Sequence, residues 1–328
     1  MNRRLILLIT VAMLVALFPF RSPAPLIYTP GEGWYYETYG TSVKWLRTRA
    51  KDQLDVAEQA FKARDYNVAL RAADRVVKVW PLSDYAPRAQ YLAARCLEAK
   101  GKDQMAFDAY QKIIQQYPKS AEYEDVLWRQ YKIADRFLHG EWPKLWGDVP
   151  YPPTMDVPAD MFGGIVTNGP YSDVAPHAQL RIGAAREKQK DYPAAVNAYE
   201  TAADRYQNRP IIVADAMYRE GMSYAKEAGT AGYDQGTAGQ AIATFTDFVT
   251  LFPNDWRVPY AQRIITTLKS QQLQGNFQIA RFYEKSHQWD GAVIYYNEVL
   301  QLDPNSHYAA LARQRIETLK PRLQVSAN

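Results

Sequence analysis

The sequence predicts an all-α fold of repeated helix pairs, and two recurring spacings carry this prediction. Four times in the 328 residues an alanine is followed twelve positions later by a proline, and the residues between them are apolar at the spacing of one helix face. A proline lacks the N–H that a continuing helix needs, so each helix is expected to end about three turns after its alanine. A fifth copy starts at Ala195, and its proline arrives late, at Pro210. The four regular pairs are Ala69 with Pro81, Ala106 with Pro118, Ala241 with Pro253, and Ala292 with Pro304.

The second spacing places another apolar helix before each of these helices. Twelve positions before the alanine stands a small residue, at Ala57, Ala94, Gly183 and Ala280. Four positions after the alanine, four of the copies carry an aromatic residue, at Tyr110, Tyr199, Phe245 and Tyr296. A helix-turn-helix unit of about 34 residues with small, aromatic and proline positions at these offsets is the tetratricopeptide signature. We therefore expect a tetratricopeptide-repeat superhelical solenoid of five helix pairs, because one pair cannot bury its apolar face alone.

The spacing between successive alanines predicts where the repeats are interrupted. The alanines lie 37, 89, 46 and 51 residues apart, so a long insertion is expected between repeats 2 and 3. This insertion is rich in Trp, Pro and Gly and should form a loop with a short helix at the edge of the solenoid. A second loop is expected from Gly229 to Gly239. The predicted organisation is a signal peptide or anchor at 1–24, an extended segment at 25–50, repeats 1–2 at 51–137, the insertion at 138–176, repeats 3–5 at 177–320 and a tail at 321–328.

The N-terminus carries the pattern of an export signal. Two arginines precede an apolar run from Leu5 to Phe18, which at about 21 Å of helix is short for a bilayer and typical of a signal-peptide core. Pro25 would obstruct cleavage after Ala24, so an uncleaved anchor in the inner membrane is the alternative. The single cysteine, Cys96, cannot form an internal disulfide, and its apolar helical position predicts a buried structural thiol.

Composition and motifs disfavour several classes of function. The net charge is +4 with both signs interspersed, which does not favour nucleic-acid binding. His139, His177, His287 and His307 lie far apart and form no metal-ligand motif. The sequence has no G-x-S-x-G motif, and its lone G-x-G lacks the strand-to-helix context of a phosphate-binding loop. We therefore expect no enzyme activity, no metal or cofactor, and no small-molecule substrate.

The remaining candidate site is the concave groove, which the first helix of each repeat lines. Exposed positions between the apolar residues of the first two units give the candidates for a client-peptide groove, Lys51, Glu58, Lys62, Arg88, Tyr91 and Arg95. Arg88 and Arg95 are seven residues apart and therefore share one helix face, with Tyr91 between them. Such a surface suits the carboxylate and aromatic side chains of an extended peptide. Ordinary solvated helix positions are the alternative interpretation of each residue.

The junctions between units carry a more specific resemblance. Pro81-Leu-Ser-Asp-Tyr-Ala86 and Pro304-Asn-Ser-His-Tyr-Ala309 share a P-x-S-x-Y-A pattern, of which Pro170-Tyr-Ser-Asp-Val-Ala175 is a variant. With Ile279-Ala-Arg-Phe-Tyr-Glu-Lys285, they resemble the family of component D of the bacterial outer-membrane β-barrel assembly machinery (BamD), over about residues 51–320.

The resemblance implies a non-enzymatic periplasmic scaffold that is peripheral to the outer membrane. In that family the N-terminal repeats receive unfolded outer-membrane protein clients, and the C-terminal repeats bind the barrel-inserting subunit. The candidates for partner-subunit binding are accordingly Phe277, Arg281, Glu284 and Lys285.

Two features depart from this family. Residues 19–34 contain no lipobox cysteine, so we expect a protein without a lipid anchor, and the insertion at 138–176 is additional. The alternative function is a periplasmic repeat chaperone or a cell-division and peptidoglycan coordinator similar to the Tol-associated one. That second family normally has an N-terminal coiled coil, which the sequence does not show. A third class, an enzyme on a repeat platform, is disfavoured by the absence of a catalytic cluster.

Overall fold

The computed structural model contains two compact units, residues 1–129 and 130–328, and the boundary between them falls within helix α6 (Tyr123–Leu138). The expected signal peptide or anchor, 1–24, lies outside the described residues. Within the part of the chain that is described, no helix is long and apolar enough to cross a membrane. The structure describes residues 26–31, 33–36, 45–142, 144–146, 149–150, 154–230 and 235–326.

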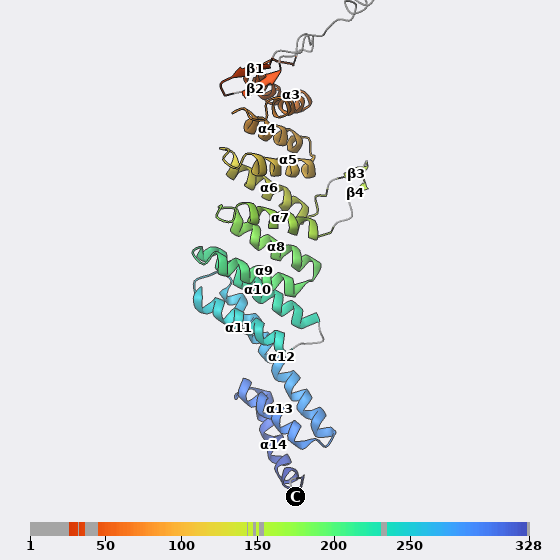
Figure 1. Ribbon diagram of the computed structural model, residues 1–328. Helices are drawn as coiled ribbons and strands as arrows, with labels where there is room; N and C mark the ends of the chain where they lie inside the picture. Colours follow the sequence, from red (N-terminus) through yellow and green to blue (C-terminus); the bar gives the residue numbers. More distant parts are fainter. Residues whose placement is uncertain are drawn as a thin grey trace, which may run out of the picture. The chain divides into compact units, whose positions relative to one another are not determined.

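The first unit stacks its helices in chain order behind a short β-hairpin (Figure 1). Its hairpin lies in the segment expected to be extended, and the Gly31 carbonyl at its turn accepts a hydrogen bond of 2.8 Å from the Asp84 N–H. Asp65 caps α3 by accepting a bond from the Val68 N–H. Its elements before α6 are β1 (Leu26–Thr29), β2 (Gly33–Tyr36), α2 (Ala50–Lys62), α3 (Tyr66–Val79), α4 (Ala86–Ala99) and α5 (Asp103–Gln116).

The core of the first unit follows the predicted offsets. Ala57, Ala69 and Ala94 are fully buried, where a larger side chain would hold neighbouring helices apart, and Tyr110 fills the space between helices. Cys96 is buried, as predicted, and burial raises the pKa of its thiol to about 12. The thiol therefore stays protonated at neutral pH and packs as a small apolar group.

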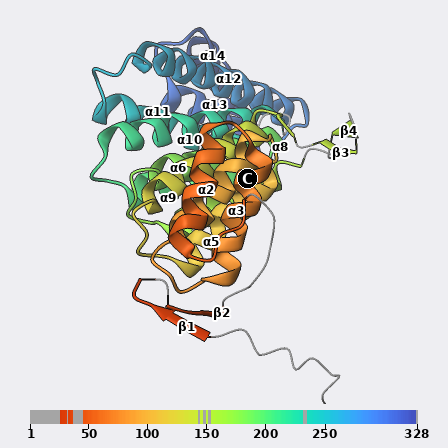
Figure 2. The same cartoon turned by 90° about the horizontal axis from the view of Figure 1, so that it is seen from above.

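The second unit continues the helix pairs. Both Figure 1 and Figure 2 show its short β-hairpin beside the helices of this unit rather than between them. After α6 its elements are β3 (Lys144–Trp146), β4 (Val149–Pro150), α7 (Asp156–Asn168), α8 (Ala175–Gln189), α9 (Tyr192–Arg205), α10 (Pro210–Thr230), α11 (Gln235–Leu251), α12 (Val258–Lys285), α13 (Trp289–Leu302) and α14 (His307–Ser326).

The predicted all-α fold of stacked repeats is confirmed, and the described helices form one pair more than the five expected. The additional pair consists of α6 and α7. The ring centre of Tyr131 in α6 lies 5.4 Å from that of Phe162 in α7. The insertion expected over 138–176 is therefore shorter, because α7 belongs to the stack and packs against α8. The expected loop from Gly229 to Gly239 is also shorter, since α10 extends to Thr230 and α11 begins at Gln235.

Two glycines of the second unit show why the first helix of a repeat carries a small residue. A Cβ added at Gly183 would lie 2.4 Å from Cε1 of Tyr199, and one at Gly221 would lie 3.0 Å from Cε1 of Phe245. Both aromatic rings are fully buried. The glycine of a first helix thus makes room for the aromatic ring of the second helix, which is the physical reason for the paired offsets in the sequence.

Candidate protein-binding sites

Tyr91 is the centre of the candidate client groove in the first unit. The guanidinium carbons of Arg88, Arg95 and Arg129 lie 5.5, 5.7 and 5.8 Å from the centre of its ring, within cation–π range. Its hydroxyl donates a hydrogen bond to Asp125 and accepts bonds of 3.1 Å from both Arg95 and Arg129. We call Arg88, Tyr91, Arg95, Asp125 and Arg129 the Tyr91 cluster.

The Tyr91 ring is not the open aromatic wall that the helix spacing predicts. Only 7% of the residue is exposed, because arginines cover the ring and Asp125 and Arg129 of the next repeat close over its hydroxyl. Partial burial opposes the charge of Asp125, but the hydrogen bonds from Tyr91 and Arg129 outweigh it and lower the pKa of this carboxyl. An incoming ligand therefore meets the arginines before it meets the ring.

The arginines of the cluster are already paired with carboxylates. Arg88 donates to Glu58 at 3.1 Å and to Glu122 at 3.3 Å, and Arg129 donates to Glu98 at 3.1 Å. Arg95 has the loosest pairing, with its Nε 4.0 Å from a Glu98 oxygen. A client carboxylate would have to replace one of these carboxylates, and the half-exposed Arg88 is the most accessible place for that exchange.

The structure brings together Glu58, Arg88, Tyr91 and Arg95 of the predicted client site. The other two predicted members, Lys51 and Lys62, lie exposed near opposite ends of α2, and the contacts of the cluster do not include them. Sequence reasoning missed Asp125 and Arg129, which follow Tyr91 by 34 and 38 residues. A spacing of about one repeat is the signal that would have found them.

The predicted partner-subunit residues divide into core and surface. Phe277 is buried, and its ring centre lies 5.5 Å from that of Tyr296 and 5.4 Å from that of Tyr308. A partner therefore cannot contact Phe277 without opening the core. Arg281 and Lys285 are exposed on α12, as a binding role requires.

The aromatic ring exposed on this part of α12 is Phe282, with 66% of the residue accessible. Successive residues of a helix point about 100° apart, so Phe282 faces solvent while its neighbour Tyr283 stacks on Tyr295.

Glu284 belongs to a structural motif that recurs in three repeats. In each, the buried tyrosine of the second helix donates to a glutamate twelve residues earlier, and these bonds measure 2.7, 2.8 and 2.7 Å. Each glutamate also faces a cation from a following helix, at 3.1, 2.9 and 3.7 Å. Burial is the main cause that raises the pKa of all three phenols. The sets are Tyr110, Glu98 and Arg129; Tyr199, Glu187 and Lys226; and Tyr296, Glu284 and Arg315.

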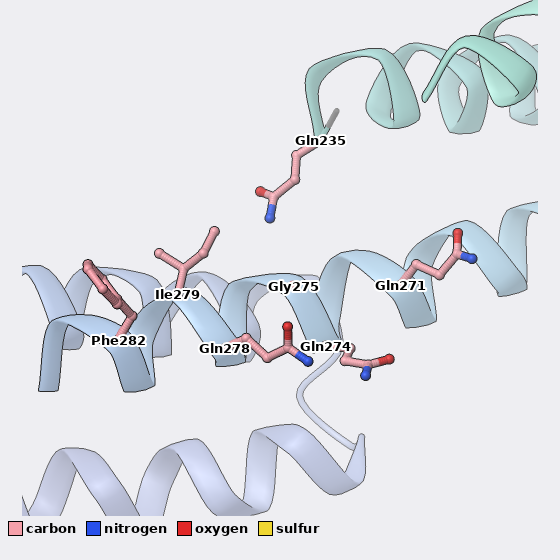
Figure 3. Close-up of a pocket in the computed structure, with 7 residues that line it drawn as sticks. All are labelled: Gln235, Gln271, Gln274, Gly275, Gln278, Ile279 and Phe282. Atoms are coloured by element: carbon pink, nitrogen blue, oxygen red, sulfur yellow. The ribbon is translucent and has the colours of Figure 1, made fainter. Parts of the chain in front are cut away.

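A groove of about 510 Å³ runs along α12 in the second unit. Figure 3 shows Gln235 reaching from the start of α11 toward α12, and Ile279 pointing into the space between them. Its lining residues are Gln235, Gln271, Gln274, Gly275, Gln278, Ile279 and Phe282, which we call the glutamine groove. The sequence prediction did not include this groove, whose side chains are amides and apolar groups.

Two protein-family models match separate parts of the chain. Residues 54–121 match the model of the tetratricopeptide repeat, and residues 166–312 match that of the YfiO family, described as outer membrane lipoprotein. No curated protein matches the chain. Among the described residues, no group of three or more His, Cys, Asp or Glu side chains is placed to hold a metal ion.

Several solved structures of repeat proteins are similar to the chain. The C-terminal part of a tetratricopeptide repeat-containing protein from Cytophaga hutchinsonii matches with a TM-score of 0.40 and 14% identity, over 80% of this chain and 87% of that one. A tetratricopeptide repeat protein from Parabacteroides merdae matches with a TM-score of 0.37 and 9% identity, over 83% and 98% of the two chains. YrrB, a repeat protein with an unusual peptide-binding site, matches with a TM-score of 0.36 and 14% identity, over 65% and 92%. Tetratricopeptide repeats at 54–121 and likeness to the outer membrane lipoprotein family at 166–312 are thus present in one chain.

Proposed function

We propose that the protein is a non-enzymatic periplasmic scaffold in the assembly of outer-membrane β-barrel proteins, similar to BamD. The observation that carries this proposal is the match of residues 166–312 to the outer membrane lipoprotein family, in the same chain as tetratricopeptide repeats. Both families generally serve as protein-interaction scaffolds. Stacked repeats provide the extended surface that such binding needs.

In this proposal the first unit receives the ends of unfolded clients at the Tyr91 cluster. A client that ends in an aromatic residue presents a carboxylate, which exchanges with Glu58 or Glu122 at Arg88. Its ring then packs on the apolar stems of the arginines, since these side chains cover Tyr91. A hydrogen bond to a charged group contributes about 1.5 to 3 kcal/mol, and the exchange retains only part of this energy.

The client proposal is tested with a labelled peptide that ends in phenylalanine and with its amidated counterpart. Fluorescence anisotropy on the full chain should show tighter binding of the free carboxylate, and Arg88→Ala with Arg95→Ala should weaken it by more than about tenfold. Arg71→Ala with Lys78→Ala is the matched control, because both residues are exposed on α3 of the same unit and removing them changes the net charge equally. Equal binding of the two peptides would place the client site elsewhere, with the segment around Trp142 and Trp146 as the next candidate.

In the same proposal the second unit binds the barrel-inserting subunit through the exposed face of the last repeat. Arg281 and Lys285 are the exposed members of the predicted set, and Phe282 adds an accessible ring beside them. Reversing both charges, with Arg281→Glu and Lys285→Glu, should abolish co-purification of that subunit from native membranes.

The control for this experiment is Lys269→Glu with Lys320→Glu, which reverses two exposed charges of the same unit outside the candidate set. Co-purification of peptidoglycan and cell-division proteins in place of the barrel-inserting subunit would support the alternative coordinator function.

The proposal places the protein at the outer membrane without a lipid anchor, since no cysteine follows the N-terminal apolar run. Metabolic labelling with a palmitate analogue should therefore give no signal on the mature protein. A labelled protein would contradict this part of the proposal. Fractionation with the inner membrane would instead support the uncleaved N-terminal anchor.

A further inference from the structure

The glutamine groove on α12 differs from an ordinary helix surface in its lack of charge. No Asp, Glu, Lys or Arg occurs from Ser270 to Ala280, although 23% of the chain is charged. The exposed positions in this stretch include Gln271, Gln274 and Gln278, whose side chains carry amides. Exposed helix positions ordinarily carry charged or polar residues, and the exposed positions of this stretch are all neutral.

We propose that the glutamine groove binds an extended, uncharged peptide segment of a partner protein through hydrogen bonds to the main chain of that segment. A glutamine amide carries an acceptor oxygen and two N–H donors, so one side chain can pair with both the N–H and the C=O of a peptide unit. A charged ligand finds no opposite charge on the lining residues, and its desolvation there is uncompensated. The lining is therefore complementary to a neutral main chain.

The dimensions of the groove suit this occupant. Eleven positions separate Gln271 from Phe282, which is about 16 Å along a helix and equals about five residues of extended chain. The volume of about 510 Å³ lies within the range of roughly 300 to 1,000 Å³ that ligand pockets occupy. Ile279 and the exposed ring of Phe282 provide an apolar surface at one end, where an apolar side chain of the peptide is accommodated.

Gly275 forms the floor of the groove. A Cβ at this position would lie 3.1 Å from Nε2 of Gln235, so the Gln235 amide lies directly over Gly275 at this point of the groove. The Gln272 amide donates to the Gln235 carbonyl at 3.2 Å and so holds the start of α11 beside α12. A glycine inside a helix is unfavourable relative to alanine. Its presence here makes room for the Gln235 amide, which a side chain at position 275 would displace.

This inference goes beyond the proposed function and stands independently of the Tyr91 cluster, which lies in the other unit. The probe is a labelled heptapeptide of alternating serine and valine with one phenylalanine near its end, acetylated and amidated so that it carries no charge. The full chain should bind this probe. N-methylation of alternate peptide bonds removes the backbone N–H donors and should weaken binding by about tenfold, and replacing two valines with aspartate should do the same.

Two variants test the groove. Gly275→Leu fills the floor and displaces the Gln235 amide, which is the far end of a flexible side chain, so the fold should keep a cooperative melt while probe affinity falls by about tenfold. Gln274→Leu with Gln278→Leu removes two amides and should lower affinity similarly. Gln314→Leu, at an exposed position of α14 outside the groove, is the matched control and should bind as the unaltered protein does.

Several results would overturn the inference. These are the absence of probe binding at millimolar peptide, equal binding of the N-methylated peptide, or unchanged affinity in Gly275→Leu. Sedimentation of the full chain tests whether a second copy of the chain occupies the groove. Self-association that Gly275→Leu abolishes would assign the groove to that second copy. The aromatic-ended peptide should bind Gly275→Leu normally, so failure of this inference is distinguishable from failure of the client proposal.

Discussion

The Tyr91 cluster and the glutamine groove present opposite chemistry to a partner. In the cluster, three arginines surround one buried ring, and carboxylates already pair with them, so the proposed client would have to exchange one ion pair for another. In the groove, amides line a surface without charge, so the proposed peptide would exchange water for hydrogen bonds to its main chain. The comparison shows that one repeat architecture can present surfaces with different selectivity, because exposed positions vary while buried offsets recur.

The largest expected effect comes from the core beneath α11. Phe245 is fully buried and lies on the helix that carries Gln235 of the groove. Phe245→Ala should lower the free energy of unfolding by about 3 to 5 kcal/mol, as large-to-small core changes do. Denaturant melts followed by circular dichroism measure this change. If binding of the groove probe is lost at a lower denaturant concentration than binding of the aromatic-ended peptide, the contrast between the sites is sharpened. A change in the free energy of unfolding below about 1 kcal/mol would contradict the assigned packing.

The next largest expected effect is a difference in how added salt changes the peptide affinities of the two sites. Each charge contact of the Tyr91 cluster is screened by added salt, whereas hydrogen bonds between neutral groups are not. Raising the ionic strength from about 0.05 to 0.5 M should therefore lower the affinity for the aromatic-ended peptide by about tenfold and leave the affinity for the groove probe nearly unchanged. Titrations of both peptides against the full chain measure this difference. An equal response of the two probes would show that the comparison of charged and neutral binding is wrong.

A pair of glycines tests the packing of the second unit, which contains the glutamine groove. At Gly183 an added Cβ meets the Tyr199 ring at 2.4 Å, and at Gly163 it meets nothing within 4 Å. Gly183→Ala should therefore destabilise the second unit by about 1 to 3 kcal/mol, as overpacking does. Gly163→Ala, the control in α7, should stabilise it by up to about 1 kcal/mol through helix propensity. Thermal melts of the two variants should move in opposite directions, and parallel shifts would contradict this packing.

The same residues show what the sequence could predict and what it could not. The alanine and proline offsets located the core because helix packing repeats them, and Tyr110, Tyr199 and Tyr296 are fully buried at the predicted position. The sequence pattern did not identify helix α7, because Gly163 stands four residues after Ala159, where four of the five predicted repeats carry an aromatic ring. Its signal was the junction at Pro170, which ends this helix as the other prolines do.

The sites were harder to predict than the core. A single helix places Tyr91 beside Arg88 and Arg95, but its burial depends on Asp125 and Arg129 from the following repeat. Phe277 and Phe282 are equally apolar in sequence, and only their packing shows which one a partner can reach. The glutamine groove needs two helices and the hydrogen bond that the Gln272 side-chain amide donates to the Gln235 carbonyl, so composition along α12 alone does not define it.

The last expected effect concerns pH, and it has opposite signs in the two units. Glu220 lies on α10, where its side chain accepts a bond of 3.2 Å from Thr244, and Glu200, Asp204 and Asp247 add negative charge around it. Desolvation first, and then repulsion by Glu200, raises the pKa of Glu220 to about 7 from an ordinary value of 4.5. Because the folded state holds this proton more tightly than the unfolded state does, ionisation destabilises the second unit as pH rises from 4.5 through about 7.

Asp125 of the first unit behaves in the opposite way, since its lowered pKa makes the folded state more stable above the ordinary value of 3.8 and removes that contribution on acidification. Glu220→Gln keeps the hydrogen-bonding shape and removes the charge, so it should raise the melting temperature at pH 8 and leave it unchanged near pH 4, where both states of the unaltered protein carry the proton. Thermal melts across this range, with Glu317→Gln at an exposed position of α14 as the control, measure the difference. A stabilisation of Glu220→Gln that is equal at pH 4 and pH 8 would show that the charge of Glu220 is not its cause.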